Sequence, residues 1–256
     1  MRIISYNVNG LRAAINKGFL EWLKTDPADI ICLQEIKANK ENVDHTKIEE
    51  IGFSTYWYSA QKKGYSGVAV FTKIKPNTVV YGCSIEQSDY EGRVIRLDFD
   101  EVSLLNAYFP SGTSGEIRQT YKYQWLDEFL DYLNELRKAK PNLIICGDYN
   151  IAHKEIDIHD PKGNKNTTGF LPEERKWLDK FFGAGYADAF RHIHADKPHQ
   201  YTWWSTRFPT VRINNKGWRI DYISVTENIK HKIKDANIYP EIKHSDHCPI
   251  YVDMKI

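Results

Sequence analysis

Short apolar runs of strand length recur along the chain, and they constrain its fold more than any other feature. Eight such runs are present, at residues 2–7, 28–35, 66–72, 93–99, 102–110, 142–150, 219–225 and 248–256. Several are rich in Ile and Val, as is typical of buried or half-buried strands. Helical patterns lie between them at 18–25, 116–139 and 172–182. Strands that alternate with helices in this way predict α/β or α+β layers built around sheets.

The longest helical pattern is also the clearest. Its apolar residues follow spacings of three and four and predict one buried face: Ile117, Tyr121, Trp125, Phe129, Leu133 and Leu136. The pattern at 172–182 opens with Pro172 followed by acids, which is typical of a helix start. Gly and Pro cluster at 110–115, 161–172 and 209–217, where we expect long loops of the kind that often carry function.

Length and composition indicate a globular protein. The chain has 256 residues, of which 41% are hydrophobic, enough for one large domain or two small ones. No low-complexity linker interrupts it, so we expect a single domain over 1–256. No apolar run reaches the length of about 18 residues that would span a membrane. The first residues are polar by position five, unlike a signal peptide, so we expect a cytoplasmic protein without a membrane partner.

The four cysteines form no metal-binding or disulfide pattern. Cys32, Cys83, Cys146 and Cys248 are spread along the chain, and three of them lie within apolar runs. We expect buried, reduced thiols, as in cytosolic proteins.

The charges balance in number but not in position. The 35 basic and 34 acidic residues leave a net charge of +1, which by itself argues against a nucleic-acid partner. However, residues 197–220 carry five Lys or Arg and no acid, whereas residues 86–101 carry six acids against two Arg. The basic segment also holds five aromatic residues, and that mixture suits a phosphate backbone with an exposed sugar or base. Alternatively, these rings belong to the core and the basic residues form a solvated rim.

Polar side chains follow run after run of apolar residues, at the point where each predicted strand ends or begins. They are Asn7, Asn9, Glu35, Tyr108, Asp148, Asn150, Asp221, Asp246 and His247. A carboxylate beside a buried strand is costly unless a metal, a partner or water compensates it. Any one of these residues could cap a loop or pair with Arg, and the asparagines could simply shape the turn before Gly10. Their shared placement predicts instead that the strand ends converge on one polar pocket.

The residue types in this pocket narrow its chemistry. Carboxylate and amide oxygens are hard ligands that suit Mg²⁺ or Mn²⁺, and these ions commonly serve phosphate chemistry. A structural zinc site is disfavoured because the cysteine clusters and the HExxH motif are absent. The Gly-rich nucleotide motifs and the G-x-S-x-G elbow are absent too. The Asp246–His247 pair with another Asp therefore favours hydrolysis by water over an activated Ser or Cys.

The motifs themselves resemble a known family. SYNVNGLRA, ICLQEIK, GDYNIAHKEIDI, DPKGN, GWRIDYI and SDHCPI together resemble the exonuclease III family of AP endonucleases, within the DNase I-like endonuclease/exonuclease/phosphatase superfamily. The likeness extends from residue 2 to about residue 252. It implies a four-layer sandwich, in which two packed, mostly antiparallel sheets are flanked by helices. It also implies hydrolysis of the phosphodiester 5′ to an abasic site, giving a 3′-hydroxyl. Exonuclease, 3′-phosphatase and phosphodiesterase activity often accompany that reaction.

The resemblance implies a metal site for Mg²⁺, with Mn²⁺ as the alternative. Glu35 is expected to be the principal ligand, with support from Asn7 and assistance from Asp246. Asp148 and Asn150 are expected to border the same site. The resemblance leaves open whether one metal or two operate.

It also implies catalytic roles. Asp148 is expected to orient or deprotonate the attacking water, and Asn150 to help place water and phosphate. Tyr108 is expected at the phosphate. His247 is expected to contact a phosphate oxygen and stabilise developing charge, with Asp221 orienting it.

The expected partner is double-stranded DNA that contains abasic sites or blocked 3′ ends. By position, Trp203, Trp218 and Ile220 match the walls of a small pocket for a flipped abasic sugar, which would select the lesion by size. Asn164 and Arg118 are expected to touch phosphates. We expect a monomer that acts on cytoplasmic, nucleoid DNA.

Two other functions are weighed against this one. A superfamily relative that acts on a phospholipid or a phosphoinositide is disfavoured by NGLRA and GWRIDY. A catalytically silent DNA-binding module is disfavoured because the set of polar strand-end residues is complete. The loop 111–115 carries no Arg or Lys, which leaves the strength of exonuclease action open.

Overall fold

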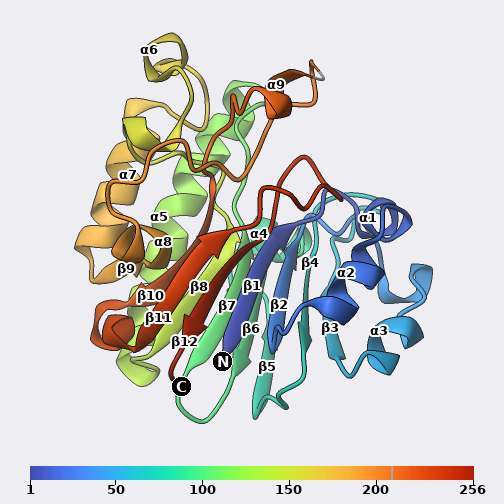
Figure 1. The fold of residues 1–256 in the computed structure, drawn as a ribbon. Coiled ribbons are helices and arrows are strands. Elements are labelled where there is room, and N and C mark those ends of the chain that lie inside the picture. The colour runs from blue at the N-terminus through green and yellow to red at the C-terminus, as the bar shows by residue number, and fades with distance from the viewer. Residues whose placement is uncertain (209) are drawn as a thin grey trace.

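The computed structural model describes residues 1–208 and 210–256, and over these residues it contains two six-stranded sheets packed face to face (Figure 1). The first sheet comprises, in spatial order, β11 (Ile233–Ile238), β12 (Ile250–Met254), β1 (Arg2–Asn7), β2 (Ile30–Gln34), β4 (Val68–Thr72) and β3 (Ser54–Tyr58). The second comprises β5 (Thr78–Tyr81), β6 (Val94–Asp98), β7 (Ser103–Tyr108), β8 (Leu143–Asp148), β10 (Asp221–Thr226) and β9 (Tyr186–Asp188). The pairs β1–β2 and β7–β8 are parallel, and the other neighbours are antiparallel.

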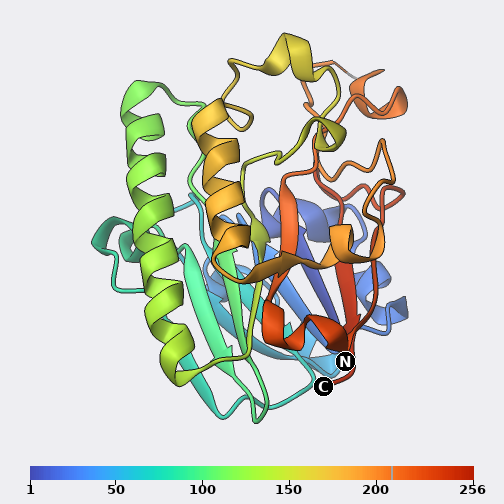
Figure 2. The same cartoon turned by 90° about the vertical axis from the view of Figure 1, so that its left-hand side faces the viewer.

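Helices cover the outer faces of both sheets and complete the four predicted layers. The first sheet is covered by α1 (Leu11–Asn16), α2 (Phe19–Thr25) and α3 (Thr46–Glu50). The second is covered by α5 (Glu116–Ala139) and α7 (Pro172–Gly183), which lie side by side in Figure 2. The remaining helical segments are short: α4 (Glu86–Tyr90), α6 (Pro161–Asn164), α8 (Ala189–Ile193), α9 (Thr210–Ile213), η1 (Lys40–Asn42), η2 (Glu155–Asp157) and η3 (Glu227–Lys232).

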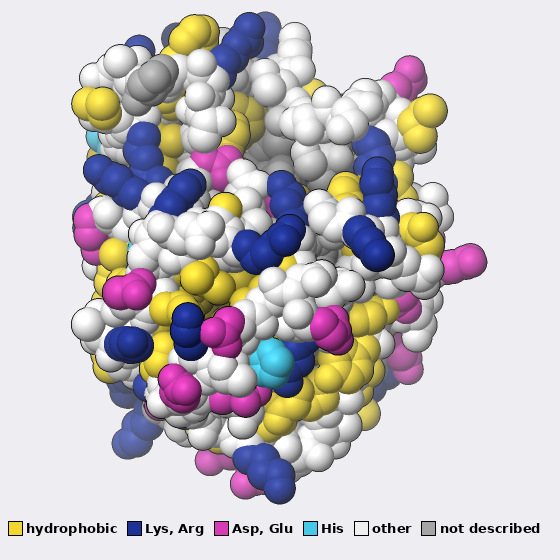
Figure 3. Space-filling model, turned by 90° about the vertical axis from the view of Figure 1, so that its right-hand side faces the viewer, with side chains coloured by type: hydrophobic (Ala, Val, Ile, Leu, Met, Phe, Trp, Pro, Cys, Tyr) yellow, Lys and Arg dark blue, Asp and Glu magenta, His cyan; other side chains and the backbone are white. Residues whose placement is uncertain are grey.

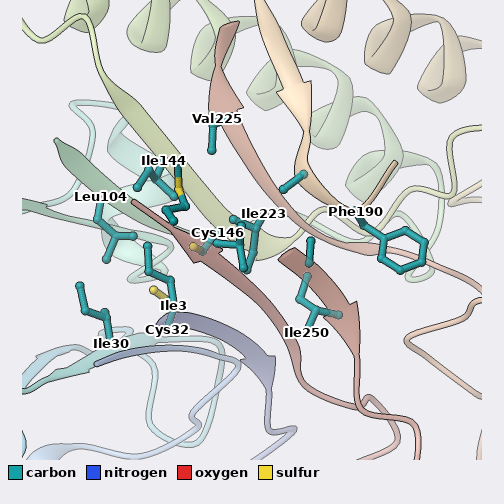
Figure 4. Packing of buried hydrophobic residues seen from close by; sticks show 14 of the residues in the cluster. Ile3, Ile30, Cys32, Leu104, Ile144, Cys146, Phe190, Ile223, Val225 and Ile250 are labelled. Carbon is teal, nitrogen blue, oxygen red and sulfur yellow. The ribbon is translucent and has the colours of Figure 1, made fainter. Parts of the chain in front are cut away.

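The layers follow from the alternation of side chains along each strand, since neighbouring residues point to opposite faces of a sheet. On β1, Ile3 belongs to the core between the sheets, whereas Ile4 packs with the helices α1 to α3. On β8, Ile144 and Ile145 divide in the same way between the inner core and the α5–α7 side. Figure 4 shows the inner core, where labelled side chains from strands of both sheets point toward one another.

The helix α5 has the predicted bounds and most of the predicted buried face: Trp125, Phe129 and Leu133 are buried, and Tyr121 and Leu136 pack partly buried against the same cluster. Its buried stripe contains Lys122, Trp125, Leu126, Phe129, Leu130 and Leu133. Ile117, predicted on the buried face, is 86% exposed, so this prediction is wrong. The spacing of apolar residues shows which side chains share a face, but Ile117 lies in the first turn, away from the apolar cluster that covers the rest of the helix.

A polar contact crosses the apolar core between the sheets. Asn106 on β7 donates through Nδ2 to the carbonyl oxygens of Leu33 (2.9 Å) and Ala69 (2.8 Å) in the other sheet. Its Oδ1 accepts from Gln34 Nε2 at 2.7 Å, and Gln34 Nε2 also lies 3.0 Å from Ser5 Oγ. These three polar side chains are fully buried. The contact therefore joins the sheets directly beneath the strand ends that carry Asn7, Glu35 and Tyr108.

The expected long loops gather at one end of the sandwich. In Figure 1 the short helices α6 and α9 lie at the end opposite the two termini. The predicted loop 161–172 contains α6, and the predicted loop 209–217 begins at residue 209, which lies outside the described residues. All four cysteines are buried and free, as predicted. Among the described helices, none combines the length and the apolarity needed to cross a bilayer.

Candidate active site

Strand ends from both sheets converge on one cavity of about 340 Å³. The parallel strand β1 ends near it with Asn7, and Glu35 directly follows β2. The parallel strands β7 and β8 end at it with Tyr108 and Asp148. The antiparallel strand β10 begins there with Asp221. The lining residues are Asn9, Glu35, Tyr108, Ser111, Thr113, Asp148, Asn150, Thr167, Thr168, Gly169, Trp203, Trp218, Ile220, Asp246 and His247.

The amide of Asn7 joins two of the carboxylates. Its Nδ2 donates to Glu35 Oε2 at 3.1 Å and to Asp148 Oδ2 at 2.8 Å, while its Oδ1 accepts the backbone N–H of Asn9. Asn7 is fully buried. It therefore links a carboxylate of one sheet to a carboxylate of the other with little freedom to move.

A chain of polar contacts continues from Glu35 across the mouth of the cavity. Lys37 Nζ lies 2.8 Å from Glu35 Oε1 and donates to Asn9 Oδ1 at 2.6 Å. Asn9 Nδ2 in turn donates to Asp246 Oδ1 at 2.9 Å. No sequence pattern singles out Lys37, whereas Asn9 is one of the polar strand-end residues predicted to reach the pocket, with a turn before Gly10 as the alternative. The φ of 43° at Asn9 agrees with that turn, but its side chain also contacts the site.

A buried histidine and two buried aspartates lie together at the cavity, which His247 and Asp148 line. His247 Nδ1 lies 2.9 Å from Asp221 Oδ2, and His247 Nε2 lies 3.9 Å from Asp148 Oδ2. Among the described residues these three form a group whose ligand atoms lie within 4.8 Å of one another.

The electrostatics of this group are set by burial and by neighbouring charge. Burial alone lowers the pKa of His247, but the hydrogen-bonded Asp221 carboxylate raises it to about 10. Burial and the charge of Asp221 raise the pKa of Asp148 to about 7. His247 is therefore a cation at neutral pH, and Asp148 is poised to exchange a proton in that range.

Asn150 and Tyr108 flank Asp148. Asn150 donates its backbone N–H to Asp148 Oδ1 at 2.8 Å and lies with Nδ2 3.2 Å from Asp148 Oδ2. Its φ of 53° makes the sharp turn that returns the side chain toward the strand end. Burial and the charges of Glu35 and Asp148 hold the pKa of Tyr108 well above its usual value, so its hydroxyl stays a hydrogen-bond donor.

One wall of the cavity is apolar. Trp203 and Trp218 meet edge to face, with ring centroids 5.8 Å apart and planes at 85°, and Ile220 and Phe170 belong to the same cluster. Trp203 Nε1 donates to Asp246 Oδ2 at 3.0 Å, which joins this wall to the carboxylates. The structure thus brings together the three residues predicted for a sugar pocket.

Two predicted DNA contacts lie outside the cavity. Arg118 donates to both carboxylate oxygens of Glu91, at 2.8 and 3.2 Å, and to the hydroxyl of Tyr65. Asn164 in α6 donates to the backbone carbonyls of His159 and Asp160. Phosphate contacts by Arg118 and Asn164 stay predictions.

The aromatic residues of the basic segment 197–220 divide between the two alternatives that the sequence left open, burial in the core and exposure at a binding site. Its Tyr201 and Trp204 are core residues, whereas Trp203 and Trp218 line the cavity and Phe208 is exposed. On the face that carries α1 to α3, Lys and Arg side chains gather across the upper half, at the end of the molecule where the strand ends meet (Figure 3). The distribution of charge, and not its sum, therefore suits a polyanion.

The donor set of the cavity fits a hard divalent cation. Glu35 and Asp246 expose carboxylate oxygens to it, and the carboxylate Asp148 and the amide Asn150 border it. Oxygen donors of this kind suit Mg²⁺ or Mn²⁺. Within the protein, Glu35 forms an ion pair with Lys37. The chemistry of these side chains allows metal-assisted hydrolysis, with a buried histidine as hydrogen-bond donor.

Comparison with known proteins places this geometry among DNA enzymes. Residues 4–247 match the profile of the Endonuclease/Exonuclease/phosphatase family. The chain is 46% identical to an exodeoxyribonuclease of Bacillus subtilis, covering 100% of both sequences. It is 40% identical to the DNA repair nuclease APEX1 of Danio rerio, covering 98% of this chain and 81% of the relative.

Solved structures agree with these sequence relatives. An AP endonuclease from Archaeoglobus fulgidus superposes with a TM-score of 0.90 at 28% identity, over 100% of each chain. The 3′ phosphatase NExo from Neisseria, bound to a product DNA hairpin, superposes with a TM-score of 0.92 at 26% identity, again over 100% of each chain. The predicted four-layer fold is confirmed.

Proposed function

The chain belongs to the endonuclease/exonuclease/phosphatase family, and on that premise we propose that it is a Mg²⁺-dependent AP endonuclease. Its relatives make it a DNA repair nuclease and a hydrolase, with AP endonuclease and 3′-end activities. The specific reaction that we propose is hydrolysis of the phosphodiester 5′ to an abasic site, which leaves a 3′-hydroxyl. One observation carries this proposal: acids, amides and a buried histidine from both sheets share a cavity with a wall of two tryptophans.

The metal would be held on the Glu35 side of the cavity. Glu35 is the proposed principal ligand, Asp246 assists, and Asn7 fixes the orientation of Glu35 through its amide. When bound, Mg²⁺ supplies positive charge that offsets the charge of the phosphate oxygens. The finer assignment to Mg²⁺ over Mn²⁺ is part of the proposal.

Asp148 is the proposed base for the attacking water. Its pKa of about 7 suits proton transfer near neutral pH. Asn7 and Asn150 each hold one of its oxygens, so the carboxylate is fixed before the substrate arrives.

His247 and Tyr108 are the proposed donors to the phosphate. The Asp221 carboxylate holds Nδ1 of His247, which leaves Nε2 free to donate to a phosphate oxygen. Because Asp221 holds His247 in place before reaction, this donor needs little reorganisation as charge develops in the transition state.

The apolar wall explains how a lesion could be selected. Trp203, Trp218 and Ile220 would enclose a sugar that lacks a base, and a sugar that carries its base would be too large. The proposed substrates are therefore double-stranded DNA with abasic sites and, without use of the pocket, DNA with blocked 3′ ends.

Three further statements complete the proposal. Residues 1–256 would act as a single domain, because the cavity takes residues from both sheets. The monomeric state and the cytoplasmic location stay predictions.

The test uses a duplex with one tetrahydrofuran abasic analogue, which resists β-elimination, so that any incision must be hydrolytic. We expect incision 5′ to the analogue in Mg²⁺ and none in EDTA. Asp148→Asn should lower kcat by roughly two to four orders of magnitude while DNA binding persists. Absence of Mg²⁺-dependent incision would refute the proposed function, and parental rates in Asp148→Asn would refute the assignment of the base.

A further inference from the structure

A fully buried ion pair lies behind the cavity and is not used by the reaction above. Lys122 Nζ on α5 is 2.5 Å from Glu174 Oε1 in the first turn of α7, and neither side chain is exposed. A buried ion pair is often no more stabilising than an apolar pair of the same volume. We therefore expect this ion pair to serve by holding neighbouring segments in place more than by adding stability.

Glu174 holds the loop that forms one side of the cavity. Its Oε2 accepts the backbone N–H groups of Gly169 (2.6 Å) and Leu171 (3.0 Å). Its Oε1 accepts from Lys122 and from Gln119 Nε2 (3.1 Å) on α5. Both oxygens are thus engaged, and the segment 167–171 is tied to two helices through one carboxylate.

Lys122 ties the same carboxylate to the catalytic turn. Its Nζ also donates to the backbone oxygen of Asn150 at 2.8 Å. Gly169 lies against that same oxygen: a Cβ at position 169 would come within 3.2 Å of it and within 3.0 Å of Trp218 Cζ3. The pair therefore holds the segment 167–171 against the turn at Asn150 and the ring of Trp218. Three residues of this segment line the cavity: Thr167, Thr168 and Gly169.

We propose that Glu174, held by Lys122, is a positioning residue for lesion selectivity. It fixes the wall 167–171 against Trp218, so that the pocket keeps the width of a sugar without a base. This inference rests on the proposed function. It adds that selectivity depends on two charged side chains outside the pocket as well as on the tryptophans within it.

The test is Glu174→Gln, which conserves volume but offers one acceptor oxygen instead of two. In either orientation, the amide NH₂ of the new side chain must face donors, either the N–H groups of Gly169 and Leu171 or the ammonium of Lys122. The variant is assayed in Mg²⁺ on the tetrahydrofuran duplex and on a duplex with a terminal 3′-phosphate. A terminal phosphate carries no sugar on its far side, so its removal does not need the pocket.

We expect kcat/KM for incision at tetrahydrofuran to fall about tenfold or more relative to kcat/KM for 3′-phosphate removal. Gln119→Ala removes one contact to Glu174 and the hydrogen bond from Thr168 Oγ1 in the wall itself, but leaves the bonds of Glu174 to Gly169 and Leu171 in place. It should shift the same ratio in the same direction by less. This milder variant decides the question if Glu174→Gln does not fold.

The matched control is Leu178→Ala, which removes a buried apolar side chain from the same helix and none of the hydrogen bonds of Glu174. A purely structural effect lowers both activities together, so this variant should keep the parental ratio. The inference is overturned if the ratio in Glu174→Gln, or in Gln119→Ala where the first does not fold, equals that of Leu178→Ala. Failure of the parental protein to cut the tetrahydrofuran duplex would instead refute the proposed function.

Discussion

Replacing Asn106 by Ala tests whether the polar contact between the sheets holds the two halves of the site together. The change removes three buried hydrogen bonds, at 2.7, 2.8 and 2.9 Å. At about 1 kcal/mol for each bond the loss of stability is about 3 kcal/mol, and it reaches about 5 kcal/mol where the partners stay unsatisfied. Small domains unfold with about 5–15 kcal/mol, so the variant should fold but with a clearly lower stability.

Urea unfolding followed by tryptophan fluorescence measures this loss as a shift in midpoint at constant slope. Ser5→Ala is the matched control, because among the described residues Ser5 Oγ accepts one bond, from Gln34 Nε2, which also lies near two other acceptors. We expect this control to lose less than about 1 kcal/mol.

The activity of the folded variant provides the second readout. Glu35 follows Gln34 in one sheet, and Asp148 ends the strand beside β7 in the other. A shift between the sheets should therefore lower kcat in Asn106→Ala but not in Ser5→Ala. A loss of stability below about 1 kcal/mol in Asn106→Ala would refute the view that this contact joins the sheets.

Three further predictions concern charge, backbone and pocket. The Asp221 carboxylate raises the pKa of His247 from 6.5 to about 10. The ion pair of the two side chains therefore stabilises the folded protein fully below pH 6.5, and this stabilisation is lost as pH rises through about 10. The difference in unfolding free energy between the parental protein and Asp221→Asn should therefore shrink over that interval, and a constant difference would contradict the pairing. Gly147→Ala should cost about 1–3 kcal/mol or more in urea unfolding, because a Cβ would lie 2.0 Å from a carbonyl oxygen of the neighbouring strand. Gly183→Ala, where the space is open, should change little, and equal losses in the two variants would count against a steric cause. Trp203→Phe should lower the preference for tetrahydrofuran over intact nucleotides about tenfold, and an unchanged ratio of incision rates would show that this ring does not set the pocket width.

The local sequence pattern predicts the bounds of the helices better than the burial of each side chain. The sequence predicts α5 with its observed bounds and α7 with its Pro start, since spacing and cap residues are local properties. It predicts that Ile117 is buried, and this is wrong because spacing does not report that the first turn of the helix lies beyond the apolar cluster. Lys122 lies on the observed buried stripe, three residues before Trp125. A lysine is not predicted to be buried from its residue type, and only the structure shows Glu174 as its partner.

Some residues of the site could be predicted from the sequence, and others only from the structure. Residue types at the strand ends predict one polar cavity, and the structure brings Glu35, Asp148, Asp246 and His247 to it. Lys37 lies two residues after Glu35 and carries no pattern of its own, so only its contact with that carboxylate reveals it.

By itself, the sequence determined eight of the strands, the helices α2, α5 and α7 and the kinds of side chain at the strand ends, because backbone periodicity and side-chain chemistry are encoded locally. It did not predict β3, β5, β9 or β11, which complete the sheets. Only the tertiary structure decided which groups meet. The Asn7 amide joins carboxylates 28 and 141 residues away, and His247 pairs with Asp221 in a buried site. Distance and burial control both the pKa of Asp148 and the width of the pocket, and neither quantity exists until the two sheets have packed together.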